Sequence, residues 1–441
     1  MRKEGIKSII LTVLVILSLF LTWNLWTYSP NIDKKNQLKY MEDVTISNKQ
    51  EIAAIVQPVQ LLYHTNDNHY GSSSEKVLGT AMKMFMDWSF SDFEDLSSDF
   101  SSQGLQNFMR KSGTSELVFS DGIPLLLYKK VINVEDRELP DVEFNRIIIK
   151  PTSDDSELGS VYFINTDKKA IYKLSTGVSD IQRLDEHVKT IYNTFQTFDS
   201  IELAENKSFY LPSEELKIKS YKYYIELLDE KEFRDALFED PQLVSRVETS
   251  RGVIFTDGII IMNVYKDIMM LNYFDPKLEE RMRRASSELL NKSIQFVNEH
   301  AGWEENYRFA EMDANRRKVT FRLYTDGLPV FNRDGMSEII QVWTQNEIYS
   351  YDRPFFTMNF PVPTETKEVT VLSGEEAVKL LMDIKDFQVD LLEGMAIGYR
   401  MTRDDTQPQL IILEPTWHYK YNGVWQPLIS VVAGGVEDGL E

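Results

Sequence analysis

The chain has 441 residues, of which 42% are hydrophobic and 12% aromatic, so it can bury folded cores and is not a disordered chain. Its net charge of −21 argues against a nucleic-acid-binding surface, because phosphate contacts need clustered Lys and Arg side chains. The sequence contains no cysteine, which excludes disulfides, thiolate catalysis and cysteine-bound zinc or iron–sulfur clusters.

The first predicted element is a transmembrane helix. The run from Ile9 to Trp26 carries no charged side chain and, at about 1.5 Å per residue, would extend about 27 Å, close to the thickness of a bilayer core. Aromatic side chains follow at its far end, at Trp23, Trp26 and Tyr28. No small-residue cleavage site comes after the run, so we expect an uncleaved anchor over residues 9–28 rather than a signal peptide.

The charges around the anchor predict its orientation. Three basic residues precede the apolar run and the last of them, Lys7, lies next to it, whereas Lys34 lies well beyond Trp26. Because basic residues tend to stay on the cytoplasmic side, we expect residues 1–8 to form a short cytoplasmic tail. The predicted location is therefore the cell membrane, with a single pass and with the C-terminal domains extracytoplasmic.

One face of the anchor is predicted to contact another membrane helix. At about 100° per residue, four hydroxyl side chains fall within an arc of roughly 120°. Small hydroxyl residues let a second helix approach closely and form hydrogen bonds with it. A chance distribution of tolerated hydroxyl residues is the alternative. The residues of this predicted partner contact are Ser8, Thr12, Ser18 and Thr22.

The rest of the chain alternates between helical and strand-like patterns. We expect an α+β fold of three extracytoplasmic domains with antiparallel sheets and packed helices, at residues 29–205, 206–300 and 301–441. In the first domain, amphipathic helices are predicted in "SSSEKVLGTAMKMFMDW" and "DIQRLDEHVKTIYNTF". Strands are predicted in "ELVFS", "IPLLLYKKV", "NRIIIKP", "SVYFINT" and "AIYKL".

The second and third predicted domains follow the same mixed pattern. A strand in "KIKSYKYYIELL" precedes a short helix in "DEKEFRDALF" and a long helix that begins at Pro276. A later helix begins at Ser373, where Glu376 completes a capping box. Each of the last two helices leads into strands, through "NYRF" and "GYRM" respectively, which indicates helices packed on antiparallel sheet.

Three stretches repeat one short pattern: "VFSDGIP", "IFTDGII" and "LYTDGLP". Asp-Gly between apolar runs is typical of a two-residue β-hairpin turn, because a type I′ turn needs positive φ at both central residues. No second ligand or catalytic partner recurs at a fixed spacing, so we interpret the repeats as structural turns. The predicted turn residues are Asp121, Gly122, Asp257, Gly258, Asp326 and Gly327, with Asn422 and Gly423 in a related Asn-Gly pair.

No pattern in the chain predicts a catalytic, cofactor-binding or metal site. The sequence lacks a P-loop, a dinucleotide-binding fingerprint and a nucleophile elbow. His64 and His69 are close in sequence, but without helical pairing their segment is interpreted as a solvated loop. The acidic segment Ser91–Phe100 matches no calcium loop and is interpreted as a solvated helix or loop.

Several segments together resemble a known family. The anchor "KSIILTVLVILSLFLTWNLWTYSP", the Asp-Gly hairpins and the C-terminal "SGEEAVKLL", "GYRM" and "LEPTWHY" are similar to the YycH (WalH) family of membrane-anchored regulators of the WalK–WalR two-component system. The resemblance covers the whole chain and implies a three-domain α+β extracytoplasmic protein with one transmembrane helix. It also implies a YycI-like partner and a WalK-type sensor histidine kinase, whose activity is modulated through membrane-helix contacts in the control of cell-wall metabolism.

The expected function is therefore that of a non-enzymatic regulator, without catalytic residues, cofactors or a small-molecule substrate. A ligand-sensing module is one alternative, and its ligand would raise the thermal stability of the protein. A carboxylate-dependent cell-wall enzyme is the other, and it would need a cleft that holds a carboxyl group of raised pKa. Whether the regulation is repression or activation stays open at this point.

Overall fold

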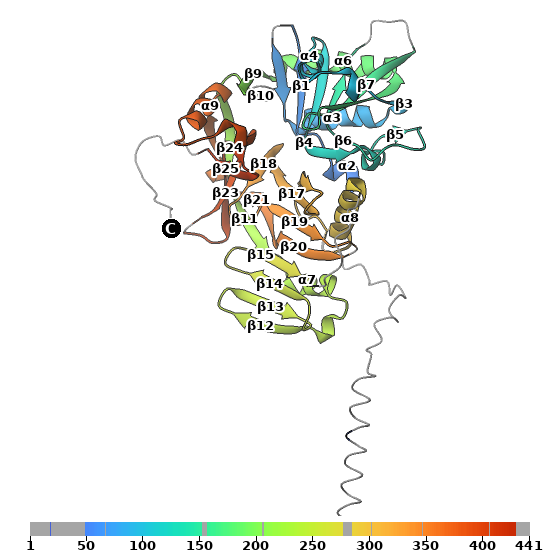
Figure 1. Ribbon diagram of the computed structural model, residues 1–441. Coiled ribbons are helices and arrows are strands. Elements are labelled where there is room, and N and C mark those ends of the chain that lie inside the picture. Colours follow the sequence, from blue (N-terminus) through green and yellow to red (C-terminus); the bar gives the residue numbers. More distant parts are fainter. Residues whose placement is uncertain are drawn as a thin grey trace, which may run out of the picture. The chain divides into compact units, whose positions relative to one another are not determined.

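The computed structural model describes residue 18 and residues 49–66, 68–151, 157–204, 207–276, 285–300, 302–345, 347–404 and 406–428. The fold is α+β and rich in sheet, with few helices (Figure 1). Two compact units make up the chain, Met1–Asp43 and Val44–Glu441, and both sheets belong to the second. No helix in the described part of the chain has the length and apolar character needed to cross a membrane. Apart from Ser18, the anchor expected at residues 9–28 lies outside the described residues.

The first sheet is built from residues 60–212, termed the N-lobe. Its ten described strands follow the order β10-β9-β2-β1-β4-β6-β7-β8-β3-β5, and all neighbours are antiparallel except β3 and β5. The strands are β1 (Gln60–His64), β2 (His69–Ser72), β3 (Ser89–Asp95), β4 (Thr114–Pro124), β5 (Asn133–Val134), β6 (Glu143–Ile149), β7 (Leu158–Asn165), β8 (Ala170–Gly177), β9 (Gln196–Ala204) and β10 (Lys207–Pro212).

Helices accompany this sheet, and the two longest confirm the predicted amphipathic patterns. Helix α3 (Glu75–Met86) buries residues at three- and four-residue spacing, such as Leu78, Met82 and Phe85. Helix α6 (Val178–Ile191) does the same, for example with Leu184 and Val188. The shorter helices are α2 (Ile52–Ile55), η2 (Ser97–Asp99), α4 (Ser102–Met109), α5 (Leu125–Tyr128) and η3 (Tyr192–Thr194).

Helix α5 corrects one sequence prediction, because "IPLLLYKKV" does not continue as a strand. Strand β4 ends at Pro124, and the next four residues turn into a helix. Leu125, Leu127 and Tyr128 are buried in this helix, whereas Leu126 is 40% exposed. One turn of helix thus buries three apolar side chains in the core. The stabilisation from this burial outweighs the preference of the local sequence for a strand.

The second sheet is built from residues 216–427, termed the C-lobe. Its fifteen described strands include the path β12-β13-β14-β15-β20-β19-β17-β18-β23-β24-β11-β21, with β16, β22 and β25 paired to β17, β11 and β24. The strands are β11 (Leu216–Leu227), β12 (Ser245–Thr249), β13 (Gly252–Thr256), β14 (Ile261–Tyr265), β15 (Met270–Phe274), β16 (Tyr307–Asp313), β17 (Lys318–Thr325), β18 (Leu328–Phe331), β19 (Glu338–Trp343), β20 (Ile348–Pro354), β21 (Phe356–Pro361), β22 (Lys367–Val371), β23 (Leu392–Arg403), β24 (Leu410–Tyr421) and β25 (Val424–Pro427).

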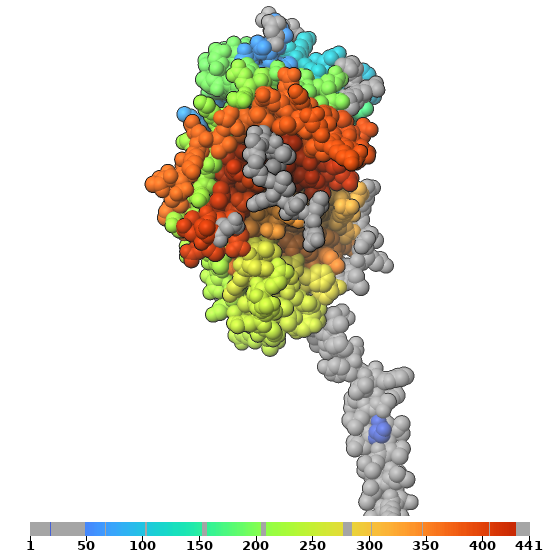
Figure 2. Space-filling model, turned by 90° about the vertical axis from the view of Figure 1, so that its left-hand side faces the viewer, coloured from blue at the N-terminus to red at the C-terminus, as the bar shows by residue number. Residues whose placement is uncertain are grey.

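The expected division between residues 206–300 and residues 301–441 does not coincide with a break in this sheet. Strand β15 pairs with β20, and β11 pairs with β24 at the other end of the C-lobe. The backbone hydrogen-bonding groups of these two early strands are thus paired with strands that come much later in the chain. In Figure 2 the C-terminal strands, coloured orange to red, accordingly lie between the N-lobe and the yellow-green region of β12 to β14.

The helices of the C-lobe begin largely as their sequences predict. Helix α9 (Gly374–Met382) starts with the expected capping box, in which Ser373 Oγ accepts from Glu376 N and Glu376 Oε2 accepts from Ser373 N. Asp229 caps α7 (Glu230–Leu237) through Lys231 N. The described part of the predicted long helix is α8 (Ser286–Glu299). The remaining short helices are η4 (Pro241–Leu243), η5 (Pro363–Glu365) and η6 (Val389–Leu391).

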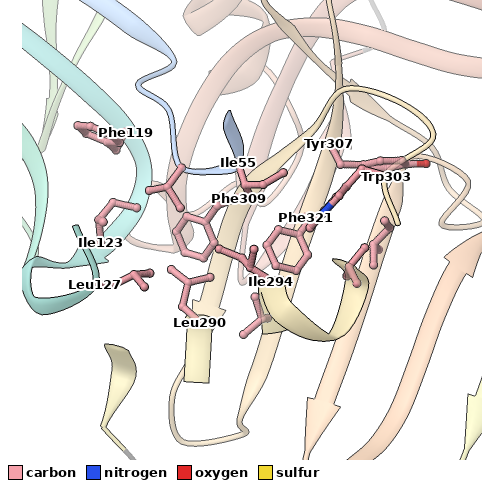
Figure 3. Packing of buried hydrophobic residues seen from close by; sticks show 14 of the residues in the cluster. Ile55, Phe119, Ile123, Leu127, Leu290, Ile294, Trp303, Tyr307, Phe309 and Phe321 are labelled. Atoms are coloured by element: carbon pink, nitrogen blue, oxygen red, sulfur yellow. The ribbon is translucent and has the colours of Figure 1, made fainter. Parts of the chain in front are cut away.

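The largest hydrophobic core runs without interruption from the N-lobe into the C-lobe. Figure 3 shows side chains of β4 and α5 beside those of α8, β16 and β17, and the labelled residues are Ile55, Phe119, Ile123, Leu127, Leu290, Ile294, Trp303, Tyr307, Phe309 and Phe321. A second contact joins β10 to α9, where a Cβ atom on Gly374 would lie 2.3 Å from Leu211 Cβ. Both lobes therefore share buried apolar surface, the main source of stability in folding.

Candidate functional site

The membrane face predicted from the sequence falls almost entirely outside the described residues. Ser8, Thr12 and Thr22 are not described, and Ser18 lies in a helix with an exposed side chain. The partner contact assigned to these four hydroxyl residues therefore stays a prediction.

Two of the four Gly-containing turn pairs form two-residue hairpin turns. Asp326 and Gly327 connect β17 to β18 with φ of 50° and 78°. Asn422 and Gly423 connect β24 to β25 with φ of 49° and 79°. Positive φ at both central positions is the geometry of a type I′ turn, the reason for which Asp-Gly and Asn-Gly are favoured there.

The pair Asp257 and Gly258 also joins two antiparallel strands, but through a longer loop. Thr256 of β13 pairs with Ile261 of β14, so four residues form the connection. Asp257 Oδ1 accepts hydrogen bonds from the amides of Ile259 and Ile260, each with a donor–acceptor distance of 2.9 Å. The carboxylate thus closes the loop on its own backbone, as Asp commonly does in turns.

The pair Asp121 and Gly122 departs from the expected hairpin, because both residues lie inside β4. The register of β4 against β6 shifts between Val118 and Ile123, which marks a bulge rather than a turn. Gly122 is not among the described glycines with positive φ. The chain continues along the same sheet, since Ile123 still pairs with Phe144 of β6.

Asp121 instead reaches across to the C-lobe. Its Oδ2 atom accepts a hydrogen bond from Met312 N of β16 over 2.7 Å, and its Oδ1 atom accepts from Gly122 N over 2.7 Å. The preceding residue, Ser120, donates to the carbonyl oxygen of Phe309 over 2.8 Å. The first Asp-Gly copy is therefore a contact between the lobes, placed directly beside their shared core.

The third Asp-Gly copy contributes to the same junction from the opposite lobe. A Cβ atom on Gly327 would lie 2.1 Å from the carbonyl oxygen of Ser73, which precedes α3. Close by, Arg308 of β16 forms an ion pair with Glu75, the first residue of α3, and Asn306 donates to the same carboxylate over 2.9 Å. Two copies of one motif thus dock the lobes reciprocally. Local sequence carries no signal for this, because it depends on which lobe each turn faces.

The environment of Asp121 changes its acidity. Burial raises the pKa of the Asp121 carboxyl to about 6, although the amides of Met312 and Gly122 donate to it. The negative charge of Glu311 acts in the same direction as burial, and the positive charge of Lys420 opposes it. The pKa of this carboxyl group therefore lies well above the ordinary value of 3.8 for an aspartate.

The two neighbouring histidines form a buried polar network rather than the expected solvated loop. His64 is fully buried in β1, and its Nδ1 lies 2.8 Å from Nδ1 of His69. On its other side, His64 Nε2 lies 3.1 Å from Glu116 Oε2, and Arg146 Nε lies 3.0 Å from Glu116 Oε1. The hairpin of β1 and β2 is thereby connected to β4 and β6. A charged residue within the apolar "ELVFS" run was the available sequence signal.

The electrostatics of this network are those of a structural ion pair. Burial alone would raise the pKa of Glu116, but the hydrogen bond and charge of His64, and then Arg146, lower it below its usual value. Burial, followed by the nearby charge of His64, lowers the pKa of His69 to about 4. His69 is therefore neutral near pH 7, and one of the two facing Nδ1 atoms donates the hydrogen bond that joins the rings.

The remaining acidic residues do not form a ligand cluster within the described residues. The segment Ser91–Phe100 is divided between strand β3 and the short helix η2, so its first half corrects the expected helix or loop. In the described ranges no group of three or more His, Asp or Glu side chains is arranged to hold a metal ion.

Comparison with known proteins gives matches along the full length. The family model for the YycH protein, N-terminal domain, matches residues 4–193, and that for the YycH protein, C-terminal domain, matches residues 206–433. The curated "Two-component system WalR/WalK regulatory protein YycH" of Bacillus subtilis (strain 168) is 24% identical over 460 residues and both chains are covered to 100%. The crystal structure of YycH from Bacillus subtilis matches with a TM-score of 0.77 and 20% identity, covering 88% of this chain and 100% of that chain. The comparison with this crystal structure shows a shared fold.

Proposed function

The chain belongs to the YycH family, and from this membership we propose that it is a non-enzymatic regulator of a two-component system of the WalR/WalK type. The observation that carries the proposal is the similarity to the curated regulatory protein over the complete length of both chains. A regulator of this kind needs binding surfaces and a path to its kinase, but no reactive groups.

The proposed path to the kinase is the N-terminal anchor. In this proposal, residues 9–28 cross the cell membrane once, the tail at residues 1–8 is cytoplasmic and the two lobes are extracytoplasmic. Ser8, Thr12, Ser18 and Thr22 would form the face that packs beside a helix of a WalK-type sensor histidine kinase. The lobes would offer the docking surface for a YycI-like protein.

Such packing regulates the kinase only if it differs between signalling states. A helix with equal affinity for the active and inactive kinase would leave their ratio unchanged, however tightly it bound. A tenfold change in that ratio needs a difference of about 1.4 kcal/mol between the two states, which a few interhelical hydrogen bonds of about 0.6 kcal/mol each can supply.

The experiment replaces the four hydroxyl residues of this face by leucine in the full-length protein. We expect co-isolation with the kinase to fall and target-gene output to change. A control variant carries Ile10→Leu, Val13→Leu and Phe20→Leu, positions that lie on the opposite arc at about 100° per residue. The control should behave as the unsubstituted protein.

Two outcomes separate the parts of the proposal. Unchanged co-isolation and output in the leucine variant would remove the assigned face. Replacement of the whole anchor by an unrelated membrane span tests the broader idea, because unchanged output in that protein would rule out action through the membrane helix.

A further inference from the structure

Strand β12 is an open edge of the second sheet. It stands at one end of the strand path of the C-lobe, and β13 is its one neighbour among the described strands. All residues of β12 are exposed. Figure 1 shows β12 at the outer end of the lobe, beyond β14 and β13. The backbone donors and acceptors along such an edge can pair with a further strand.

The other strands that end the two sheet paths have features that discourage such pairing. Strand β5 has only 2 residues. Strands β10 and β21 each end in a proline and have an irregular register with their neighbours. Strand β12 contains no proline, and its register against β13 is regular. Because short strands, prolines and bulges are the usual protection of a sheet edge, β12 is the end strand best suited to pairing.

The hairpin of β12 and β13 determines which backbone groups face outward. The carbonyl oxygen of Arg251 accepts a hydrogen bond from the amide that follows β14, so the groups of the next residue, Gly252, face β12. Gly252 pairs with Thr249 of β12, whose groups therefore face β13. Since this direction alternates along a strand, the backbone groups of Arg246 and Glu248 face the open edge.

The sequence of β12, "SRVET", is complementary to itself. In an antiparallel pair of two such strands, related by a two-fold axis at Val247, Arg246 of each copy would oppose Glu248 of the other. The two Val247 residues would oppose each other, and Ser245 would oppose Thr249. This register also joins the outward-facing backbone groups, because Arg246 and Glu248 would exchange hydrogen bonds in both directions at each of their positions.

The side chains of β12 fit the same arrangement. Arg246 and Glu248 point to one face of the sheet, where Arg246 Nη1 lies 2.9 Å from Glu248 Oε1 and the two side chains are 37% and 77% exposed. On the other face, Val247 is 52% exposed and pairs with the half-buried Ile254 of β13. Two joined copies would align these apolar residues in one row and place opposite charges across from each other on the other face.

We propose that β12 is a self-association edge, to which a second copy of this chain adds its own β12 in antiparallel orientation about Val247. The alternation of Arg246 and Glu248 around the two-fold position favours a second copy over an unrelated strand. Each copy carries a net charge of −21, so we expect association to need the screening of physiological salt. This inference goes beyond the proposed regulatory role and does not depend on it, so either can fail without the other.

The experiment uses disulfide crosslinking of the full-length protein in detergent, because the chain has no cysteine. In the proposed register the Cα atoms of the two Val247 residues would lie about 4.5 Å apart, within the range of about 4.4–6.8 Å that a disulfide spans. The Val247→Cys protein is oxidised with copper phenanthroline at roughly 0.15 M salt. We expect a covalent dimer on a non-reducing gel.

Two cysteine variants serve as controls. Val424→Cys replaces a valine of strand β25 that is 58% exposed, and its dimer yield should be several times lower. Arg246→Cys lies on β12 itself, but its two copies would be about 8.5 Å apart in the proposed register, too far for a disulfide. Equal dimer yields from Val247→Cys and Val424→Cys would overturn the self-association.

Charge reversal in the Val247→Cys protein tests the register. Arg246→Glu or Glu248→Arg alone turns both opposite-charge pairs of the dimer into like-charge pairs, so each should lower the dimer yield roughly tenfold. An equimolar mixture of the two proteins pairs an acidic strand with a basic one and should restore the yield. A mixture that crosslinks no better than its separate components would overturn the two-fold register about Val247.

Discussion

Gly327 of the C-lobe lies against Ser73 of the N-lobe so closely that a Cβ atom at position 327 would stand 2.1 Å from the Ser73 carbonyl oxygen. Gly327 also has a φ of 78°, a conformation that L side chains rarely adopt. One residue thus meets a conformational requirement of the β17–β18 turn and a steric requirement of the junction between the lobes.

Substitution Gly327→Ala should therefore destabilise the protein more than a turn substitution ordinarily does. The left-handed backbone costs about 1–2 kcal/mol for any residue with a Cβ atom, and the collision with a backbone carbonyl adds to it. We expect a loss of more than 2 kcal/mol in the free energy of unfolding, a rough figure, measured by urea denaturation. Gly423→Ala is the control, with a φ of 79° and no atom within 4 Å of the added carbon. Equal losses in the two variants would contradict the docking role of Gly327.

The shared core predicts that one buried leucine in α8 supports both lobes. Leu290 is fully buried where α8 meets the N-lobe (Figure 3), so Leu290→Ala should cost about 2–5 kcal/mol. Leu126→Ala provides the comparison, because Leu126 is a leucine of the adjoining helix α5 that is 40% exposed. Differential scanning calorimetry should show both lobes of the Leu290→Ala protein melting together at a lower temperature. An N-lobe that keeps its original melting temperature would refute the common core.

A buried ion pair in the C-lobe should be sensitive to the loss of one partner. The side chains of Arg353 and Glu304 are 1% and 4% exposed and are paired, and Arg353 also donates to Tyr351 Oη over 2.9 Å. Arg353→Met leaves a carboxylate buried without its cation, which costs about 3–5 kcal/mol. The double variant with Glu304→Gln should recover part of that loss, as a double-mutant cycle would show. The exposed pair of Arg251 and Asp267 is the control, and Arg251→Met should change little. Losses that simply add in the double variant would argue against a coupled pair.

The stability of the C-lobe should fall as the pH rises towards neutrality, because of Glu305. Burial raises the pKa of this carboxyl group from 4.5 to about 7, although Met358 N donates to it over 2.6 Å. The stabilisation is complete below the ordinary pKa and is lost as the pH rises through 7, and it amounts to at most about 3 kcal/mol. Urea denaturation of the Glu305→Gln protein from pH 4.5 to pH 8 should show a flatter profile than the unsubstituted protein. An identical slope in the two proteins would exclude Glu305 as its source.

Much of the local structure follows from short-range patterns. The apolar spacing that predicts α3 and α6 also makes those helices bury one face, and the capping box at Ser373 depends only on residues within one turn. The Asp-Gly copies show where this reasoning ends. Asp326 forms the predicted turn, whereas Asp121 lies in a bulge, because the strand after it continues to pair with β6 and its carboxyl group finds an amide of the other lobe.

Glu116 within the apolar "ELVFS" run signals a buried polar contact, but that His64 is its partner could not be predicted locally. The two residues lie on different strands, and the register that brings them together is set by apolar pairing along the whole of β1 and β4. The extent of the second sheet was missed likewise, since nothing near β11 indicates that β24 is its neighbour.

The pairing of β11 with β24 has a consequence for biosynthesis. Strand β11 is complete at residue 227, but its partners β21, β22 and β24 begin only at residues 356, 367 and 410. At typical translation speeds, the ribosome needs roughly 6–26 s to reach the first of these partners and roughly 10–40 s to reach β24. Until the first partner is made, a tyrosine-rich strand stays unpaired while the preceding lobe can already close. We therefore expect holding chaperones to bind this stretch, and an interrupted nascent chain to aggregate through it.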